Sequence, residues 1–318
     1  MISRSSILAF LAAFLLTLLG VRYCSVFAVA GNGFDLSNTS VPAEEIHPGG
    51  PPRDGISSID NPKFISADKA GGLSDGEQVL SLTLNGVTRA YPISILNWHE
   101  LVNDEIAGQP VVISFCPLCG TGMAFSSEVK GKRLEFGVSG LLYNSDVLLY
   151  DRTTDSLWSQ IKSEAVSGPL IGEKLELLPL IQMTWSSWKA RYPEGEVLSR
   201  DTGYLRNYNS NPYGRYDESP VIYFPVEFLS RAYHPKERVL GIEVEGKYKA
   251  YPFAELSKYG GSELKDHFNG NDLLIRFDTS SRTGEVIDEK TGRTKPAVNA
   301  FWFAWYTFHP QTEVFTSP

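Results

Sequence analysis

The sequence contains an internal duplication, which limits the possible fold more than any other feature. Residues 82–92 (LTLNGVTRAYP) align with residues 242–252 (IEVEGKYKAYP) at an offset of 160. Each segment predicts a strand, a tight turn at glycine and a second strand that ends in Ala-Tyr-Pro. The match continues at an offset of 162, where residues 108–115 (GQPVVISF) align with residues 270–277 (GNDLLIRF). Two copies are too few for a stacked repeat array, so we expect two related units about a pseudo-twofold axis.

The two copies differ in length. Residues 188–197 (WKARYPEGEV) resemble residues 305–314 (WYTFHPQTEV) at an offset of only 117, so copy one is longer by 45 residues. The predicted fold class is α+β: β-rich, mostly antiparallel, with two duplicated units and short helices near residues 93–102 and 184–192. A composition that is 42% hydrophobic can supply the core of such a fold without disulfide support.

These patterns predict five segments along the chain. They are a signal peptide (1–30), an extended leader (31–60), copy one with the sequence Cys-Pro-Leu-Cys-Gly (61–200), a polar connector (201–238) and copy two, which lacks the cysteines (239–318). The connector is a long irregular segment, and such segments in compact proteins often form part of a binding surface.

The N-terminus predicts export. Arg4 precedes an apolar run from Ile7 to Val21, and Ala28-Val-Ala30 offers a small-x-small cleavage site. We therefore expect a periplasmic or extracellular protein. The alternative is an uncleaved N-terminal anchor, the only case in which a membrane would be a partner. Cleavage would leave 27 basic and 37 acidic residues, a balance that argues against nucleic acid as a partner.

Cleavage would also remove Cys24, so that Cys116 and Cys119 become the only cysteines of the mature chain. Copy two has Asp278 and Ser281 at the equivalent positions, which indicates that the fold does not need the thiols and that their role is functional. A thioredoxin-type dithiol requires a helix after the second cysteine, but Gly-Thr-Gly follows Cys119. Cys-Pro-x-Cys-Gly after a strand is instead typical of a metal-binding knuckle.

A metal site of this kind needs further ligands from outside the knuckle. The candidates are His99, which precedes the cysteine strand, His309 at the end of copy two, and the thioether of Met123. Thiolate, imidazole and thioether ligands favour copper or zinc. The absence of Cys-x-x-Cys-His argues against covalently attached haem. The expected partner is a small molecule or a metal-delivery protein.

Several longer motifs then occur in order: WHELVND (98–104), SFCPLCGTG (114–122), FGVSGLLYNSD (136–146), YDR (150–152) and LWSQ (157–160). Together they resemble domain-of-unknown-function family 3179, found in bacteria and archaea, over about residues 55–318. The family is defined by its motifs and not by an activity. The resemblance implies that its characteristic positions include the following residues: His99, Cys116, Cys119, Asn144, Asp146, Asp151, Arg152, Trp158 and Gln160.

The last six of these positions lie in the extra length of copy one, where they are expected either to form a pocket wall or to be a hydrogen-bonded network that holds the insertion together. Three functions follow from the sequence. The first is a copper or zinc site used in metal handling or in a metal-dependent reaction. The second is a thiol–disulfide oxidoreductase that uses Cys116 to attack and Cys119 to resolve. The third is a non-catalytic binding module in which the two cysteines form a structural disulfide.

Overall fold

The computed structural model describes residues 31–318, and the predicted signal peptide lies outside this part. Most strands in it pair antiparallel, and four α-helices of seven residues each accompany them. A β-rich, mostly antiparallel fold with short helices is therefore confirmed. Five of its sheets have four or five strands each, and in this number and size they resemble the blades of a five-bladed β-propeller, a more specific architecture than the predicted class. Between residues 31 and 318, no helix has the length and apolar character needed to cross a membrane.

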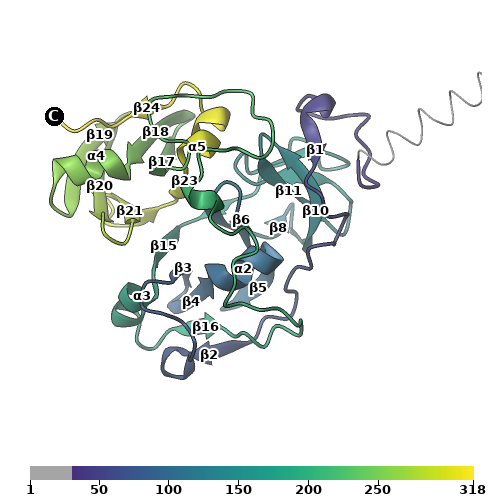
Figure 1. Ribbon diagram of the computed structural model, residues 1–318, viewed down its shortest axis with the longest axis horizontal. Helices are drawn as coiled ribbons and strands as arrows, with labels where there is room; N and C mark the ends of the chain where they lie inside the picture. Colours follow the sequence, from purple (N-terminus) through teal and green to yellow (C-terminus); the bar gives the residue numbers. More distant parts are fainter. Residues whose placement is uncertain (1–30) are drawn as a thin grey trace, which may run out of the picture.

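Each copy has a base sheet in which two long strands are flanked by shorter ones (Figure 1). In copy one its order is β15 (Leu180–Thr184), β3 (Gln78–Leu84), β4 (Val87–Pro92), β16 (Glu196–Leu198) and β2 (Phe64–Ser66). In copy two the order is β23 (Val298–Phe301), β17 (Arg238–Val244), β18 (Lys247–Pro252) and β24 (Glu313–Val314). Helices α2 (Ile93–His99) and α3 (Trp185–Arg191) of copy one correspond in order to α4 (Phe253–Tyr259) and α5 (Trp302–Phe308) of copy two.

Each copy also has a hairpin sheet, which the chain enters after the first helix. In copy one the order is β14 (Leu177–Leu178), β7 (Thr121–Ser126), β6 (Gln109–Cys116) and β5 (Leu101–Ile106). In copy two it is β22 (Thr294–Lys295), β21 (Thr283–Asp288), β20 (Asn271–Asp278) and β19 (Glu263–Phe268). Apart from β2, which has no counterpart in copy two, the order of strands along the chain and within the sheets is thus the same in both copies.

The register of the strands agrees with the sequence offsets. Phe115 pairs with Gly122 in copy one, and Phe277 pairs with Gly284 in copy two. Cys116 and Asp278 occupy equivalent positions as the next residues of β6 and β20. The duplication predicted from the sequence is therefore present at the level of residue pairing. The pseudo-twofold axis stays a prediction.

The repeated Ala-Tyr-Pro has a structural reason. The Tyr91 hydroxyl donates to Asp104 Oδ2 at 2.6 Å, and the Tyr251 hydroxyl donates to Asp266 Oδ2 at 2.8 Å. Each bond ties a base sheet to its own hairpin sheet. The proline that follows is the N-cap residue of α2 or α4, a position at which its missing N–H costs no helical hydrogen bond.

The extra length of copy one forms an additional sheet, called here the insert sheet. Its strands are β1 (Ile46–Pro48), β10 (Phe136–Tyr143), β11 (Asp146–Asp151), β12 (Leu157–Ser159) and β13 (Glu164–Ser167). A small hairpin, β8 (Glu128–Val129) and β9 (Lys132–Arg133), precedes it. The predicted leader supplies β1, and its Phe34, Val41 and Ile46 are buried against the insert sheet. Short 3-10 helices lie at Ala43–Glu45, Ala67–Lys69 and Tyr216–Glu218.

The largest hydrophobic cluster lies where copy two meets the insert and hairpin sheets of copy one. It contains both cysteines together with Trp158 of the insert and Phe301 of copy two. The Phe301 amide donates to the carbonyl of Cys119 at 2.9 Å. The cysteine turn is therefore enclosed by the insert and by copy two, two parts of the chain that are distant from each other in sequence.

One predicted element needs correction. The helix expected over residues 93–102 ends at His99, because Glu100 takes a positive φ of 58° and β5 begins at Leu101.

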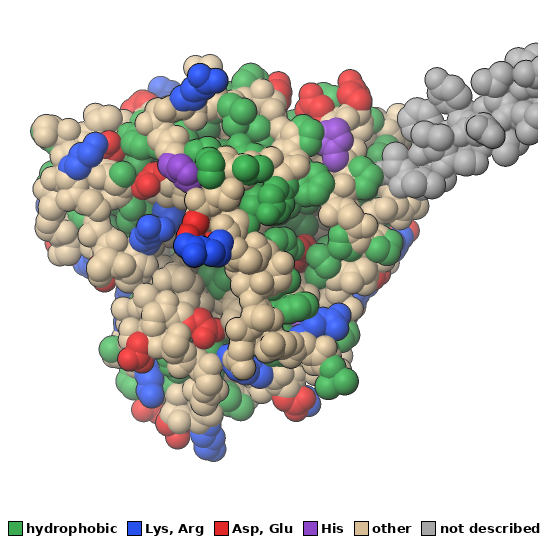
Figure 2. All heavy atoms as spheres, in the orientation of Figure 1, with side chains coloured by type: hydrophobic (Ala, Val, Ile, Leu, Met, Phe, Trp, Pro, Cys, Tyr) green, Lys and Arg blue, Asp and Glu red, His purple; other side chains and the backbone are tan. Residues whose placement is uncertain are grey.

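On the surface, acidic and basic side chains are interspersed over the face shown in Figure 2, with no large area of one charge sign. The predicted polar connector also exposes large apolar side chains, among them Leu205, Tyr223 and Leu229.

Candidate metal centre

The cysteine turn joins β6 to β7 and has the hydrogen bonding of a knuckle. The Cys119 amide donates to Cys116 Sγ at 3.4 Å. Gly120 follows with φ of +60°, and a Cβ at this position would lie 2.8 Å from the Phe301 ring. Glycine is thus required both by backbone conformation and by the close approach of copy two.

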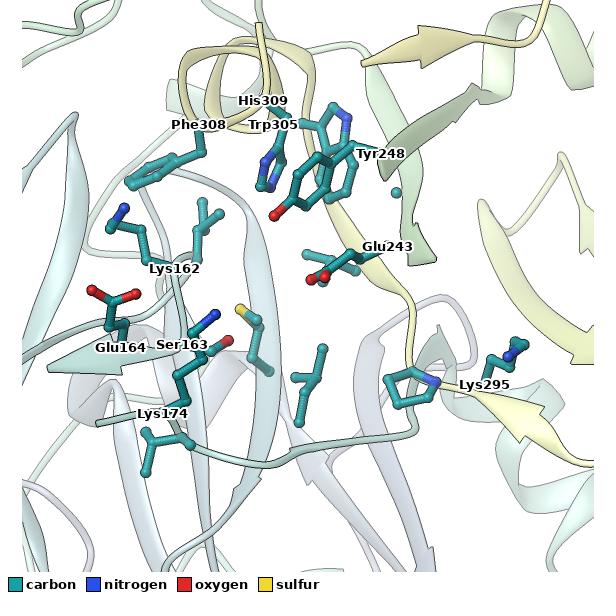
Figure 3. Close-up of a pocket in the computed structure, with 17 residues that line it drawn as sticks. Lys162, Ser163, Glu164, Lys174, Glu243, Tyr248, Lys295, Trp305, Phe308 and His309 are labelled. Carbon is teal, nitrogen blue, oxygen red and sulfur yellow. The ribbon is translucent and has the colours of Figure 1, made fainter. Parts of the chain in front are cut away.

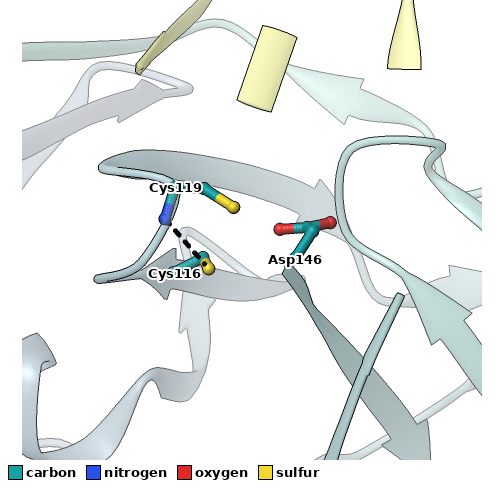
Figure 4. A group of neighbouring side chains, drawn as sticks. All are labelled: Cys116, Cys119 and Asp146. Carbon is teal, nitrogen blue, oxygen red and sulfur yellow. Dashed lines mark hydrogen bonds between the residues drawn. The ribbon is translucent and has the colours of Figure 1, made fainter. Parts of the chain in front are cut away.

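Asp146 completes a group with the two thiols (Figure 4). The Sγ atoms of Cys116 and Cys119 and a carboxylate oxygen of Asp146 all lie within 4.8 Å of one another. Asp146 is the first residue of β11, after a turn in which Asn144 and Ser145 both have positive φ. The turn also directs the Ser145 carbonyl toward the cysteines, where it accepts a hydrogen bond from Cys119 Sγ at 3.4 Å.

Burial dominates the electrostatics of this group. It raises the pKa of the Asp146 carboxyl to about 7, and it raises the pKa of both thiols, that of Cys119 most. A second carboxyl, Glu100, is also buried, and its pKa is likewise raised to about 7 although it accepts a hydrogen bond from the Tyr213 hydroxyl at 3.0 Å. Four acidic groups thus share a buried region, where a proton or a metal cation stabilises them.

The residues present fit a metal ion. Asp146 Oδ2 accepts from the amide of Ile161 at 3.0 Å. Its Oδ1 is buried and has no hydrogen-bond partner among residues 31–318. The thiols of Cys116 and Cys119 are the side-chain donors nearest to this buried carboxylate. A cation held between the carboxylate and the two sulfurs would stabilise the ionised form of all three groups. The donor set is two thiolates and one carboxylate, all of which are ligands that zinc accepts.

His99 does not belong to this group. It is buried, with Nδ1 2.7 Å from the Ser57 carbonyl and Nε2 2.7 Å from the Tyr208 hydroxyl. Both ring nitrogens therefore have protein partners, which leaves neither for a metal. Its contacts instead fix the leader and the connector to the end of α2.

His309 is not part of the Cys–Cys–Asp group, and Met123 lies in the same buried cluster as the two cysteines. Both line a cavity between the insert and copy two (Figure 3). The His309 ring stacks on Tyr248 with 3.8 Å between ring centroids. Met123 is on β7, two residues after the turn, opposite Ser114 in β6. The structure thus brings both predicted ligands to one cavity, and of the two only Met123 shares a buried cluster with the thiols.

Of the predicted pocket residues, Asp151, Arg152 and Trp158 form hydrogen bonds that hold the insert together. Asp151 Oδ2 accepts from Trp158 Nε1 at 3.0 Å, and Asp151 Oδ1 accepts from the Thr154 amide at 2.6 Å. Arg152 pairs with Asp60 of the leader at 2.8 Å. These contacts match the alternative expectation of a hydrogen-bonded network.

Asn144 and Gln160 lie nearer the cysteines. Asn144 Oδ1 accepts from the amide of Glu227 in the connector at 2.7 Å. Gln160 Nε2 donates to Ser114 Oγ at 2.7 Å, next to the cysteine strand, and its Oε1 is buried without a partner among the described residues. Only Asp146, of the six pocket candidates, joins the thiols directly.

Sequence reasoning missed four residues around the centre. Glu100 lies inside the WHELVND motif next to His99, and this position in the sequence could have identified it as a candidate site residue. The other three, Tyr213, Tyr216 and Lys236, come from the connector and have no local pattern. Tyr216 is buried with its hydroxyl unpartnered among residues 31–318. Lys236 lies 3.7 Å from the Tyr216 ring, and burial lowers its pKa to about 8.

Copy two shows the form that the turn takes without cysteines. Asp278 is exposed there, and its carboxylate accepts hydrogen bonds from the hydroxyls of Ser280 at 2.6 Å and Ser281 at 2.8 Å. The equivalent turn of copy two is therefore closed by hydrogen bonds between neighbouring solvent-accessible side chains. The buried sulfurs of copy one are not needed to make the turn.

The comparisons with known proteins agree with the motif resemblance. The model of a protein family of unknown function, DUF3179, matches residues 53–293, which include the cysteine turn, the insert and most of copy two. Neither the curated proteins nor the solved structures contain a match to the chain. The match covers well over half of the sequence, and the chain therefore belongs to the DUF3179 family.

Proposed function

We propose that this chain is an exported metal-binding protein in which Cys116, Cys119 and Asp146 hold a zinc ion. The observation that carries the proposal is the convergence of two sulfurs and one carboxylate within 4.8 Å in a fully buried site. The burial of Asp146 Oδ1, which has no geometrically ideal hydrogen-bond partner among residues 31–318, adds to this support. Export rests on the signal-peptide pattern of residues 1–30.

The ligand set favours zinc over copper. Cu(I) prefers thiolate and thioether ligands, whereas zinc also takes carboxylate oxygen. The thioether that would favour copper belongs to Met123, which lines the neighbouring cavity. A carboxylate beside two thiolates is therefore better matched to zinc.

Three protein ligands leave one position for water, for substrate or for a ligand from a delivery partner. A zinc ion there would supply Lewis acidity and would lower the pKa of a bound water. Glu100 and Tyr213 are the groups of the chain best suited to move a proton nearby, because the Glu100 pKa of about 7 lies in the range at which a carboxyl both accepts and donates. The same arrangement supports a metal-dependent reaction and metal handling.

A redox dithiol is less well supported. Reactive cysteines have lowered pKa values and partial exposure. Cys116 and Cys119 are buried, and burial raises the pKa of both thiols. Both are free thiols and not a disulfide. If the redox function were correct, Cys119→Ser would accumulate a mixed disulfide with a partner.

The test is metal analysis of purified residues 31–318 and matched variants. Cys116→Ser, Cys119→Ser and Asp146→Asn should each lose the zinc that the wild-type protein carries, measured by mass spectrometry of the metal and by competition with a chromogenic chelator. The controls are Asp278→Asn and Ser281→Ala, the equivalent positions of copy two, which should keep it. Wild-type zinc content in all three copy-one variants would exclude this centre. Fractionation of cells that express the full chain tests export separately.

A further inference from the structure

A cavity of about 440 Å³ lies between the insert and copy two, separate from the cysteine turn (Figure 3). The insert supplies Lys162, Glu164 and Lys174 on one side, and copy two supplies aromatic side chains on the other. This volume lies in the range of small-molecule sites. The polar side chains that line the cavity indicate a polar or charged ligand.

The copy-two wall presents flat rings. Tyr248 and His309 stack with 16° between their planes, and the Trp305 ring lies 4.3 Å from His309 between centroids. Burial lowers the pKa of His309 to about 3, so the imidazole is neutral at physiological pH. Within residues 31–318 the His309 ring makes no hydrogen bond of its own, so its nitrogens are available to a ligand.

The insert wall presents cationic groups. Lys162 and Lys174 are exposed at the edge of the cavity, and neither forms an ion pair in the described part of the chain. The charge of Lys162 contributes to the lowered pKa of His309, which places the ammonium group near the aromatic wall. With Lys295, which is 3.6 Å from Asp288, three lysines line the cavity against the two carboxylates of Glu164 and Glu243.

The duplication provides an internal control for the aromatic wall. Glu243 and Tyr248 are a cross-strand pair, and their copy-one equivalents are Thr83 and Thr88, whose hydroxyls simply bond to each other at 2.8 Å. The equivalent of His309 is Tyr192, which packs on its own helix. The base sheet therefore folds without these cavity-lining side chains.

A second difference opens space for the cavity. In copy one, Trp188 Nε1 donates to Ser81 Oγ at 2.9 Å. The equivalent pair in copy two is Trp305 and Gly241, and a Cβ at residue 241 would lie 2.2 Å from the Trp305 ring. Trp305 instead donates to Thr312 Oγ1 at 3.0 Å. Glycine thus allows the indole to lie against the sheet beneath the cavity.

We propose that this cavity binds a small organic anion that carries a flat ring. Lys162 and Lys174 hold the anionic group, and the ring lies against the stacked Tyr248 and His309. A lysine ammonium binds a carboxylate as a point charge without a fixed geometry, so two of them at the rim accept anions of different shapes. The proposal does not depend on a bound metal, although Ile161 connects the two sites by lining the cavity and donating to Asp146.

The probe is 2-naphthoate, compared with the uncharged 2-naphthamide and the cationic 2-naphthylmethylamine, on residues 31–318 by isothermal titration calorimetry at low salt. Two exposed lysines should make naphthoate bind about three- to tenfold more tightly than the amide. The double variant Lys162→Gln, Lys174→Gln should abolish this preference, and Lys189→Gln, an exposed lysine of α3, should keep it. His309→Ala should weaken the naphthoate and the amide alike.

The measurements are made on zinc-loaded and on chelator-treated protein, and the same preference is expected in both. Tighter binding of the amine than of naphthoate would overturn the proposal, because the carboxylates would then define the site. Equal binding of all three probes, or a preference that survives the double lysine variant, would overturn it as well.

Discussion

Replacing Asp146 with asparagine should remove a large part of the pH dependence of stability of the metal-free protein. Burial raises the pKa of this carboxyl from 3.8 to about 7. The native state therefore holds the proton more tightly than the unfolded chain does. The contribution of Asp146 to the free energy of unfolding is complete below pH 3.8 and is lost as the pH rises through 7. The reason is that the native carboxyl must then ionise in a buried environment.

The size of the effect follows from the two pKa values. At pH 5 the unfolded carboxyl is already ionised and the native one is still protonated. At pH 8 both are ionised. Integration of the proton difference between these pH values gives a loss of about 2–3 kcal/mol in the free energy of unfolding for this one group. Asparagine at residue 146 carries no charge and should not contribute this loss.

The assay is urea denaturation of chelator-treated residues 31–318 at pH 5 and pH 8, for wild type and Asp146→Asn. The difference between the two pH values should be smaller in the variant by about 2–3 kcal/mol. Glu100 contributes a loss of the same sign in both proteins. That loss is smaller in the variant, because the Asp146 charge no longer raises the pKa of Glu100, so the change measured for Asp146→Asn includes this coupling. Asp278→Asn is the control, because that carboxylate is exposed. An equal pH dependence in wild type and Asp146→Asn would refute the desolvation of Asp146.

Three further results are expected. Gly120→Ala should lower the free energy of unfolding by more than about 1 kcal/mol, since φ is +60° and the new Cβ would lie 2.8 Å from Phe301; an unchanged urea midpoint would show that the turn can relax. Asp151→Asn should lower the free energy of unfolding by about 1–3 kcal/mol, because Trp158 Nε1 loses its acceptor, and the zinc content should stay at the wild-type level. Loss of zinc from a folded Asp151→Asn variant would show that Asp151 is part of the metal centre. His99→Ala should likewise lower stability and keep zinc; a folded variant with at least about tenfold weaker zinc binding would restore the original prediction that His99 is a ligand.

Much of the fold was accessible from the sequence, because the duplication repeats local signals. Glycine turns and Ala-Tyr-Pro fix the turn type and the register, and residues 115 and 277 therefore reach equivalent pairings. The replacement of Cys116 by Asp278 in the second copy correctly indicated that the hairpin forms without thiols. The strand β5 was missed because a single positive φ at Glu100 ends a helix that the apolar pattern would have continued.

The composition of the centre was decided by tertiary structure. The sequence placed Asp146 either in a pocket wall or in a hydrogen-bonded network, and only the packing of the insert sheet on the cysteine turn brings its carboxylate to the sulfurs. His99 was the nearest histidine in the chain, yet the leader and the connector occupy both its nitrogens through Ser57 and Tyr208. Local periodicity encodes strands, turns and which face of a strand is buried. Which side chains from distant segments share one buried volume depends on how the sheets pack, and no spacing within a segment records that.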